Sequence, residues 1–232
     1  MEIKTKKELK FSIFADKIMN DDYGDSIYGK IRKLLSPDFK YRSRFLVEMR
    51  KVSYYKHQKG ILNKLLLGYH YAKYEKLGIK LGFTIGCDAL GYGVVIPHYG
   101  TIVVGNTNRI GNYAVLQTST CISSNGKVIG DGLYMGSGAK ITSKVTLGNN
   151  ISVGANSLVN KDCLQDNILL GGMPAKIIRQ EETWYIRDSQ NRSERKLAFG
   201  ISSDSYAERV KKVEALKKQM GVGGQGLCGD GI

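Results

Sequence analysis

Long apolar runs and paired cysteines are both missing from this sequence of 232 residues. The longest apolar stretch, residues 61–69, is interrupted by Asn63 and Lys64, so we expect no segment that spans a bilayer. The first residues do not form a signal peptide. The four cysteines show no CxxC spacing and no paired framework, which is typical of free thiols in a reducing compartment. We therefore expect a cytoplasmic protein.

Histidine is also rare. There are three, and His57 and His70 both fall in a part of the chain with a helical pattern. A metal site needs several ligands, so we expect none here. Nucleic-acid-binding motifs are missing as well, although the net charge is +14. Residues 1–80 hold 19 Lys and Arg against 9 Asp and Glu, or +10. Such a region is either a solvated helical surface or a contact for an anionic partner such as nucleic acid, an acidic lipid surface or an acidic glycan.

What the sequence does contain is an aliphatic residue at every sixth position through its middle. The series accepts one inserted residue after its fourth member and consists of Val104, Ile110, Leu116, Ile122, Ile129, Met135, Ile141, Leu147, Val153 and Val159. A period of six is neither helical nor simply alternating, and it indicates a repeat rather than an ordinary sheet with fortuitous spacing. Each unit should form one short strand and a corner, so that stacked units bury a continuous core.

The rest of the chain divides around this repeat. Residues 1–80 are expected to be helical, with Pro37 in a first helical turn. Apolar residues there recur at threes and fours, in two groups: Phe45, Leu46, Met49 and Val52, then Leu62, Leu65, Leu66, Tyr69 and Ala72. Residues 81–180 form the repeat region. Residues 181–232 form a C-terminal extension, with one amphipathic helix expected over residues 204–220.

Three stretches of the repeat region resemble a known family. Residues 96–105, IPHYGTIVVG, closely resemble the catalytic coil of the serine acetyltransferases, which are hexapeptide-repeat acyltransferases. Residues 136–140, GSGAK, and residues 171–178, GGMPAKII, are similar to the segments that hold acetyl-CoA there. The likeness is closest to the divergent branch associated with bacterial surface-polysaccharide genes. It implies a mainly β protein, a left-handed parallel β-helix with an α-helical N-terminal region. It also implies a homotrimer with active sites between chains. In true serine acetyltransferases the helical region pairs trimers into hexamers, but here this region is shorter, so a trimer and a hexamer both stay open.

The resemblance also implies the roles of individual residues. His98 would be the general base that takes the proton from an acceptor hydroxyl, a task for which imidazole is well suited. The acetyl group would pass directly from acetyl-CoA, and backbone N–H groups of residues 136–139 would stabilise the oxyanion. The implied contacts to acetyl-CoA are Ser137, Gly138, Ala139, Ala155, Lys161, Pro174, Lys176 and Arg179.

Three departures from serine acetyltransferases bear on the acceptor. Pro97 replaces a residue that is commonly acidic, Phe83 replaces a carboxylate that commonly orients the histidine, and the loop at residues 123–127 has no histidine. The charges of free serine then lack obvious partners, which favours a hydroxyl of a sugar or polysaccharide precursor. Tyr99, as a flat apolar face, and Asp88 are the candidate acceptor-binding residues. The alternatives are a serine O-acetyltransferase of cysteine synthesis and a non-catalytic β-helix scaffold.

Overall fold

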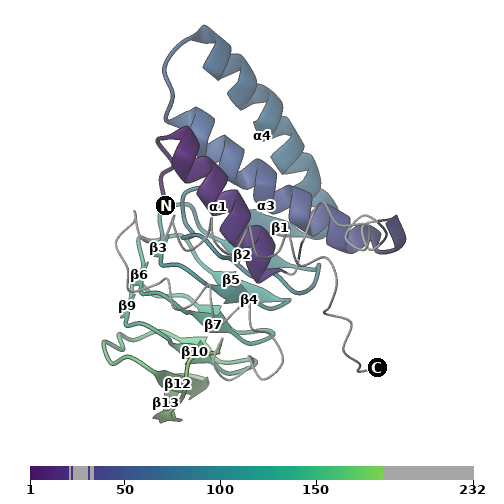
Figure 1. Cartoon of the computed structure of the whole chain (residues 1–232). Coiled ribbons are helices and arrows are strands. Elements are labelled where there is room, and N and C mark those ends of the chain that lie inside the picture. Colours follow the sequence, from purple (N-terminus) through teal and green to yellow (C-terminus); the bar gives the residue numbers. More distant parts are fainter. Residues whose placement is uncertain (21, 23–30, 32–33, 185–232) are drawn as a thin grey trace, which may run out of the picture.

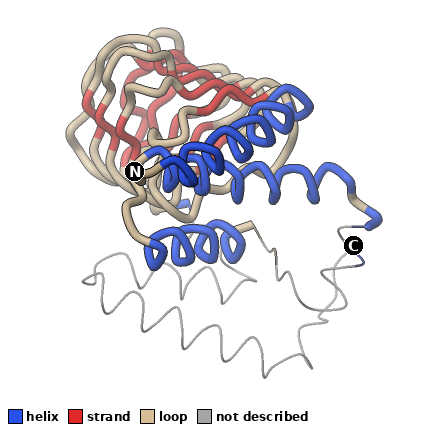
Figure 2. Tube along the Cα trace, turned by 90° about the horizontal axis from the view of Figure 1, so that it is seen from above, coloured by secondary structure: helices blue, strands red, loops and turns tan. Residues whose placement is uncertain are grey.

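The computed structural model describes residues 1–20, 22, 31 and 34–184. In this part of the chain, helices α1, α3 and α4 lie across one end of a β-solenoid (Figure 1). The view from above shows the same arrangement, with the strands following one another in stacked coils (Figure 2). The C-terminal helix expected over residues 204–220 and the fourth cysteine, Cys228, lie outside the described residues.

The helices begin and end at recognisable signals. Helix α1 (Lys6–Met19) starts with a capping box, in which the Glu8 N–H donates to Thr5 Oγ1 and the Thr5 N–H donates to Glu8 Oε2. Helix α3 (Pro37–Lys56) has Pro37 in its first turn, as predicted. Helix α4 (Ile61–Leu81) ends at Gly82, whose φ of 79° is left-handed. Helix α3 packs against both α1 and α4, and α4 leads into the first strand.

The two predicted apolar groups have different environments. The group in α3 is buried, with Phe45, Leu46, Met49 and Val52 at most 3% exposed. In α4 the buried positions are instead His70, Tyr74, Gly78 and Leu81. Leu62, Leu65 and Tyr69, which belong to the apolar pattern that predicted this helix, are exposed. The helical prediction is therefore confirmed, but this apolar stripe faces solvent.

The solenoid has three faces, each a parallel sheet with one short strand per coil. The first sheet contains β1 (Phe83–Ile85), β2 (Ile102–Val104), β5 (Thr120–Ile122), β8 (Lys140–Ile141) and β11 (Leu158–Val159). The second contains β4 (Val115–Leu116), β7 (Tyr134–Met135), β10 (Ser152–Val153) and β12 (Ile168–Gly172). The third contains β3 (Arg109–Ile110), β6 (Val128–Ile129) and β9 (Thr146–Leu147). Strand β13 (Ala175–Gln180) pairs antiparallel with β12 and closes the solenoid.

The predicted repeat sets the register of these sheets. Every member of the aliphatic series, from Val104 to Val159, is at most 5% exposed and belongs to the interior of the solenoid. A regular coil has 18 residues, as in the pairing of Ile102 with Thr120 (120 − 102). The chain passes from the first sheet to the third, then to the second, so each coil has three corners. The six-residue period thus gives one inward aliphatic side chain per face.

Candidate functional site

His98 lies at the corner where the first coil turns from the second sheet to the first. Val95 pairs with Val115, which is 20 residues later (115 − 95), so this coil is longer than a regular coil. Both extra residues fall at this corner. The buried aliphatic residues on either side of it, Ile96 and Val104, are eight positions apart, whereas the regular spacing is six. The corner therefore bulges outward. His98 and Tyr99 are both exposed on it.

The same corner of the following coils stacks directly below His98. Gly100 contacts the next coil so closely that a Cβ at this glycine would lie 2.4 Å from Thr118 Oγ1. Further along, the Gly138 N–H donates to the Thr118 carbonyl, and the Asn156 N–H donates to the Ser137 carbonyl. We call this column the His98 edge. It consists of residues 97–101, 117–119, 136–138 and 154–156.

Small residues on the His98 edge leave backbone groups accessible. The N–H groups of Gly136, Gly138 and Ala139 already donate to backbone carbonyls at 2.8, 3.0 and 3.0 Å. Those of Ser137 and Ala155, which are both exposed, have no partner in the described part of the chain. Free N–H groups at the tips of these two corners can donate to the amide oxygens or carbonyl of a bound thioester. Of residues 136–139, Ser137 is thus the one whose N–H remains available for an oxyanion.

The other predicted acetyl-CoA contacts do not all reach this edge. Pro174 and Lys176 are exposed in the closing hairpin of β12 and β13. Arg179 is exposed on β13 and pairs with Glu181 at 3.0 Å. Lys161 lies at a different corner, between the first and third sheets, because it follows β11 and precedes the bridge from Cys163 to Leu147. The structure therefore groups Ser137, Gly138 and Ala155 with His98 and leaves Lys161 apart.

The acceptor candidates are also separated. Tyr99 is beside His98, but Asp88 is at the corner between the first and third sheets and is bound there by helix α3. Ser53 Oγ donates to Asp88 Oδ1 at 2.6 Å and Lys56 Nζ donates to Oδ2 at 2.8 Å. Burial opposes ionisation, but these two donors hold the pKa of Asp88 below its ordinary value. Asp88 is thus a carboxylate that joins the helices to the solenoid, and Phe83 is buried, so neither orients His98.

The strand leading to His98 is held by helix side chains that the sequence analysis did not single out. Asn20 Nδ2 donates to the Val94 carbonyl at 2.6 Å, and Asn20 Oδ1 accepts from the Ile96 N–H at 3.2 Å. Arg42 Nη1 donates to the Ile96 carbonyl at 2.7 Å, two residues before His98. No earlier coil exists to pair with this backbone, so α1 and α3 supply the missing partners. One signal for Arg42 was available, because it falls at helical spacing from the buried Leu46 and Met49.

A buried ion pair completes this attachment. Arg50 and Asp16 are both almost fully buried, with Arg50 Nε 2.7 Å from Asp16 Oδ2. Arg50 Nη1 also donates to the Leu90 carbonyl at 3.0 Å, and Asp16 Oδ1 accepts from the Val94 N–H at 3.0 Å. Arg50 thus donates two hydrogen bonds to Asp16, and the pair's other contacts, to Leu90, Gly91 and Val94, are with the backbone of the first coil.

Replacing Arg42 with methionine should lower kcat about tenfold with little change in the KM for acetyl-CoA. The variant leaves the buried Ile96 carbonyl without its donor, and misplacement by about 1 Å at a catalytic group costs on the order of a hundredfold in rate. Steady-state kinetics of Arg42→Met and Arg42→Lys measure this, since lysine keeps a donor and should recover part of kcat. Arg44→Met, at an exposed position two residues away, is the matched control. Equal kcat values for both methionine variants would mean that Arg42 does not position the backbone that leads to His98.

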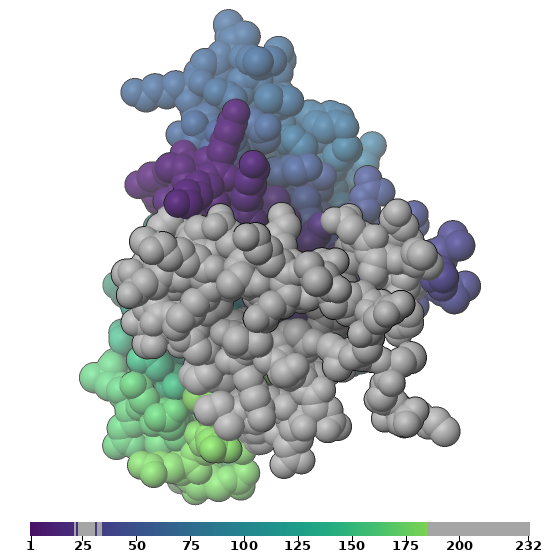
Figure 3. Space-filling model, viewed as in Figure 1, coloured from purple at the N-terminus to yellow at the C-terminus, as the bar shows by residue number. Residues whose placement is uncertain are grey.

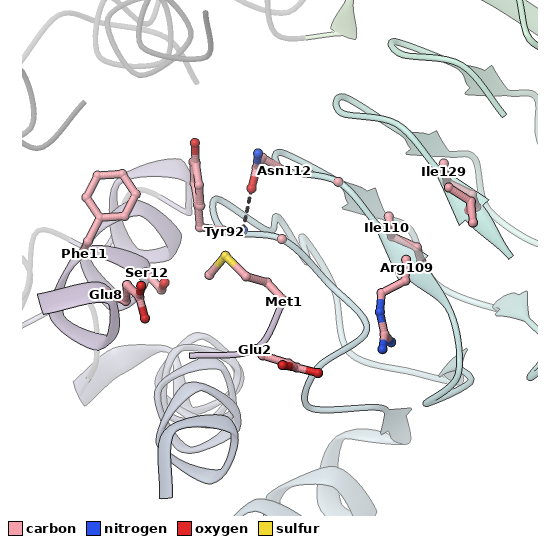
Figure 4. Close-up of a pocket in the computed structure, with 13 residues that line it drawn as sticks. Met1, Glu2, Glu8, Phe11, Ser12, Tyr92, Arg109, Ile110, Asn112 and Ile129 are labelled. Atoms are coloured by element: carbon pink, nitrogen blue, oxygen red, sulfur yellow. Dashed lines mark hydrogen bonds between the residues drawn. The ribbon is translucent and has the colours of Figure 1, made fainter. Parts of the chain in front are cut away.

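A cavity of about 530 Å³ lies elsewhere, between the N-terminal segment, α1 and the third sheet (Figure 4). Phe11, Tyr92 and Ile110 give it a largely apolar lining, and the Tyr92 N–H donates to Asn112 Oδ1 at its edge. None of the predicted site residues lines it. The His98 edge is by contrast an exposed ridge of the single chain.

Other site types find little support among the residues that the structure describes. No group of three or more His, Cys, Asp or Glu side chains there is arranged to hold a metal ion. Cys87, Cys121 and Cys163 are free thiols, and Cys163 is buried among core residues of the solenoid. None of the described helices is long and apolar enough to cross a membrane.

Comparisons with known proteins agree with this architecture. No protein-family model matches the chain, and no curated protein sequence matches it significantly. Among solved structures, it is similar to the serine acetyltransferase of Neisseria gonorrhoeae, with a TM-score of 0.55 and 20% identity over 80% of this chain and 70% of the other. Soybean serine acetyltransferase complexed with serine gives 0.54 and 21% over 74% and 70%. A serine acetyltransferase in complex with CoA gives 0.50 and 18% over 72% and 70%.

At these identities the likeness establishes the fold. The chain is a left-handed parallel β-helix with an α-helical N-terminal region, as the resemblance implied, and its stacked coils are those that the repeat predicted. The activity still has to be argued from the residues of the site, because one fold hosts many functions.

Proposed function

We propose that this protein is an acetyl-CoA-dependent O-acetyltransferase. The observation that carries the proposal is the His98 edge. It combines an exposed histidine, on a corner lengthened by two residues, with two free N–H groups on the corners below it. A histidine that no other side chain engages in the described chain is available as a base. Similarity to serine acetyltransferases, one of them in complex with CoA, supports acetyl-CoA as the acetyl donor.

The chemistry assigns each group a task. His98 accepts the proton of the acceptor hydroxyl as its oxygen attacks the thioester carbon of acetyl-CoA. The Ser137 N–H donates to the oxygen that gains negative charge, and coenzyme A leaves as the thiol. Transfer is direct in this proposal. No cysteine lies on the His98 edge, and no hydroxyl of the described chain is hydrogen-bonded to His98 as an activated nucleophile would be.

The site is proposed to lie between chains of a homotrimer. On a single chain the His98 edge is a ridge rather than a cavity, and His98 and Ser137 are two coils apart. A neighbouring solenoid packed beside this edge would supply the second wall, with His98 of one chain facing the small residues of another. Closed threefold symmetry repeats the same contact at each of three sites.

The acceptor favoured by the comparisons is L-serine. The solved structures reported above are serine acetyltransferases, and one is complexed with serine. We therefore propose serine O-acetylation, the alternative from the sequence, ahead of acetylation of a sugar. A saccharide hydroxyl is the second candidate. Pro97 carries no charge to pair with the ammonium group of serine, and the exposed ring of Tyr99 offers a flat apolar face for a sugar ring.

Assays with acetyl-CoA and either L-serine or nucleotide sugars separate the two acceptors. We expect L-serine to be acetylated with a kcat/KM of about 10⁴ M⁻¹s⁻¹ or more, which is the ordinary range for an enzyme and its substrate. Tyr99→Ala should then change the KM for serine little, because serine has no ring to stack. Turnover of a saccharide alone, with its KM raised several-fold by Tyr99→Ala, would transfer the assignment to the second candidate.

A further inference from the structure

The hairpin of α3 and α4 has an unusual composition. From Met49 to Tyr74 the sequence contains no aspartate or glutamate, whereas it contains six cations: Arg50, Lys51, Lys56, Lys59, Lys64 and Lys73. The same 26 residues include five tyrosines. Arg50, Lys51 and Lys56 form ion pairs with Asp16, Glu48 and Asp88. Lys59, Lys64 and Lys73 have no ion pair in the described part of the chain, so uncompensated charge lies toward the end of the hairpin.

The end of this hairpin is apolar as well as basic. Ile61, Leu62 and Leu65 begin α4, and their exposures of 81%, 68% and 68% show that nothing in the described part of the chain covers them. Tyr69 continues the stripe one turn later and is also exposed. Because α4 runs down into β1, its first turns are its far end from the solenoid (Figure 1). The space-filling view shows the blue atoms of α4 as a projection at the end of the molecule opposite the closing hairpin (Figure 3).

We propose that this tip, residues 59–65 with Tyr69, docks on an anionic lipid surface. Isoleucine and leucine side chains would enter the boundary between headgroups and acyl chains, while Lys59 and Lys64 would meet lipid phosphates. Tyrosine is the residue type that favours this boundary, because its ring is apolar and its hydroxyl is polar.

Charge and apolarity together select this partner over others. A second copy docking through the same face would bring Lys59 and Lys64 of two chains together, which like-charge repulsion opposes. The phosphates of a nucleic acid would pair with the lysines, but the side chains of Ile61, Leu62 and Leu65 would stay exposed to water. A membrane surface with acidic headgroups satisfies both features, and it needs no helix long enough to span the bilayer.

Vesicle flotation of the full chain tests the proposal. Phosphatidylcholine vesicles are compared with vesicles that also contain phosphatidylglycerol, and the chain should float only with the second kind. Binding should fall as salt is raised from about 0.05 M to about 0.5 M, where the Debye length shrinks. The triple variant Ile61→Gln, Leu62→Gln, Leu65→Gln should lose at least about tenfold in partitioning. The double variant Ile79→Gln, Leu164→Gln also alters exposed apolar residues, but outside the tip, and should bind as the wild type does.

A charge reversal provides the second arm. Lys64→Glu should weaken partitioning about tenfold, whereas Lys144→Glu, an exposed reversal on the solenoid, should not. Circular dichroism checks that the variants stay folded, which is expected because all these side chains are exposed. Equal flotation by the triple variant and the wild type, or no flotation of the wild type, would overturn the proposal. A loss of mass by light scattering in the triple variant, without flotation, would instead assign the face to a second copy.

Discussion

Replacing His98 with alanine should lower kcat by about 10²–10⁴-fold, the usual contribution of a general acid–base group. His98 is exposed, and its ring makes no hydrogen bond within the described chain, so its loss should not weaken the fold. The KM for acetyl-CoA should change little, because the proposed donor contacts belong to other corners of the solenoid. Steady-state kinetics of thiol release measure both constants.

The matched control is His57→Ala, which alters a histidine of the helical region outside the His98 edge. His57 Nδ1 is 2.7 Å from the Ser53 carbonyl oxygen, so this substitution removes a local contact but should leave kcat near the wild-type value. A His98→Ala enzyme that retains more than about a tenth of wild-type kcat would remove His98 as the base.

Replacing Arg50 with methionine should lower the free energy of unfolding by about 3–5 kcal/mol, the range for breaking one side of a buried ion pair. The variant leaves the Asp16 carboxylate buried without its cation and removes the hydrogen bonds that Arg50 donates to the Leu90 and Gly91 carbonyls. Urea denaturation followed by circular dichroism measures the change.

Two further variants make this result specific. Arg44→Met alters an exposed arginine of the same helix and should cost less than about 1 kcal/mol. Asp16→Leu combined with Arg50→Met removes both charges, and the loss should be well below the sum of the two single losses, because no unpaired charge remains. A cost near 1 kcal/mol for Arg50→Met would mean that the first coil does not depend on this pair.

The solenoid could be predicted from the repeat because the six-residue period depends only on contacts within a coil and between adjacent coils. Each aliphatic residue from Val104 to Val159 is buried by its own coil and the two adjacent coils, so the pattern could be read without knowledge of distant contacts. Pro37 at a helix start was predictable for the same reason, since a first turn does not need the proline's missing N–H.

The attachment of the helices to the first coil could not be predicted in this way. Arg50 contacts Leu90, 40 residues away, and Asn20 contacts Val94, 74 residues away, and neither spacing leaves a periodic trace. The exposure of the apolar stripe that contains Leu62 and Leu65 could not be predicted for a related reason. Periodicity identifies the apolar face of a helix, but it does not say whether that face is covered by the chain or left for a partner.

The candidate site was predictable only in part. His98 and Ser137 share an edge because whole coils separate them, so the repeat itself brings them into one column. Lys161 was expected among the acetyl-CoA contacts as a cation for the phosphates of the cofactor, and it follows β11 and so falls at a different corner of its coil from the His98 edge. The position of a residue within its coil, rather than its distance along the chain, decides which edge it joins.

Coenzyme A release measured with acetyl-CoA, in the presence and absence of an acceptor, tests the central claim most directly. Free thiol should appear only when an acceptor hydroxyl is supplied, and mass spectrometry should find an acetyl ester on that hydroxyl and no acetyl group on the protein. If acetyl-CoA shows no binding by calorimetry and no thiol is released with L-serine or any nucleotide sugar, the protein is a β-helix scaffold and not an acetyltransferase.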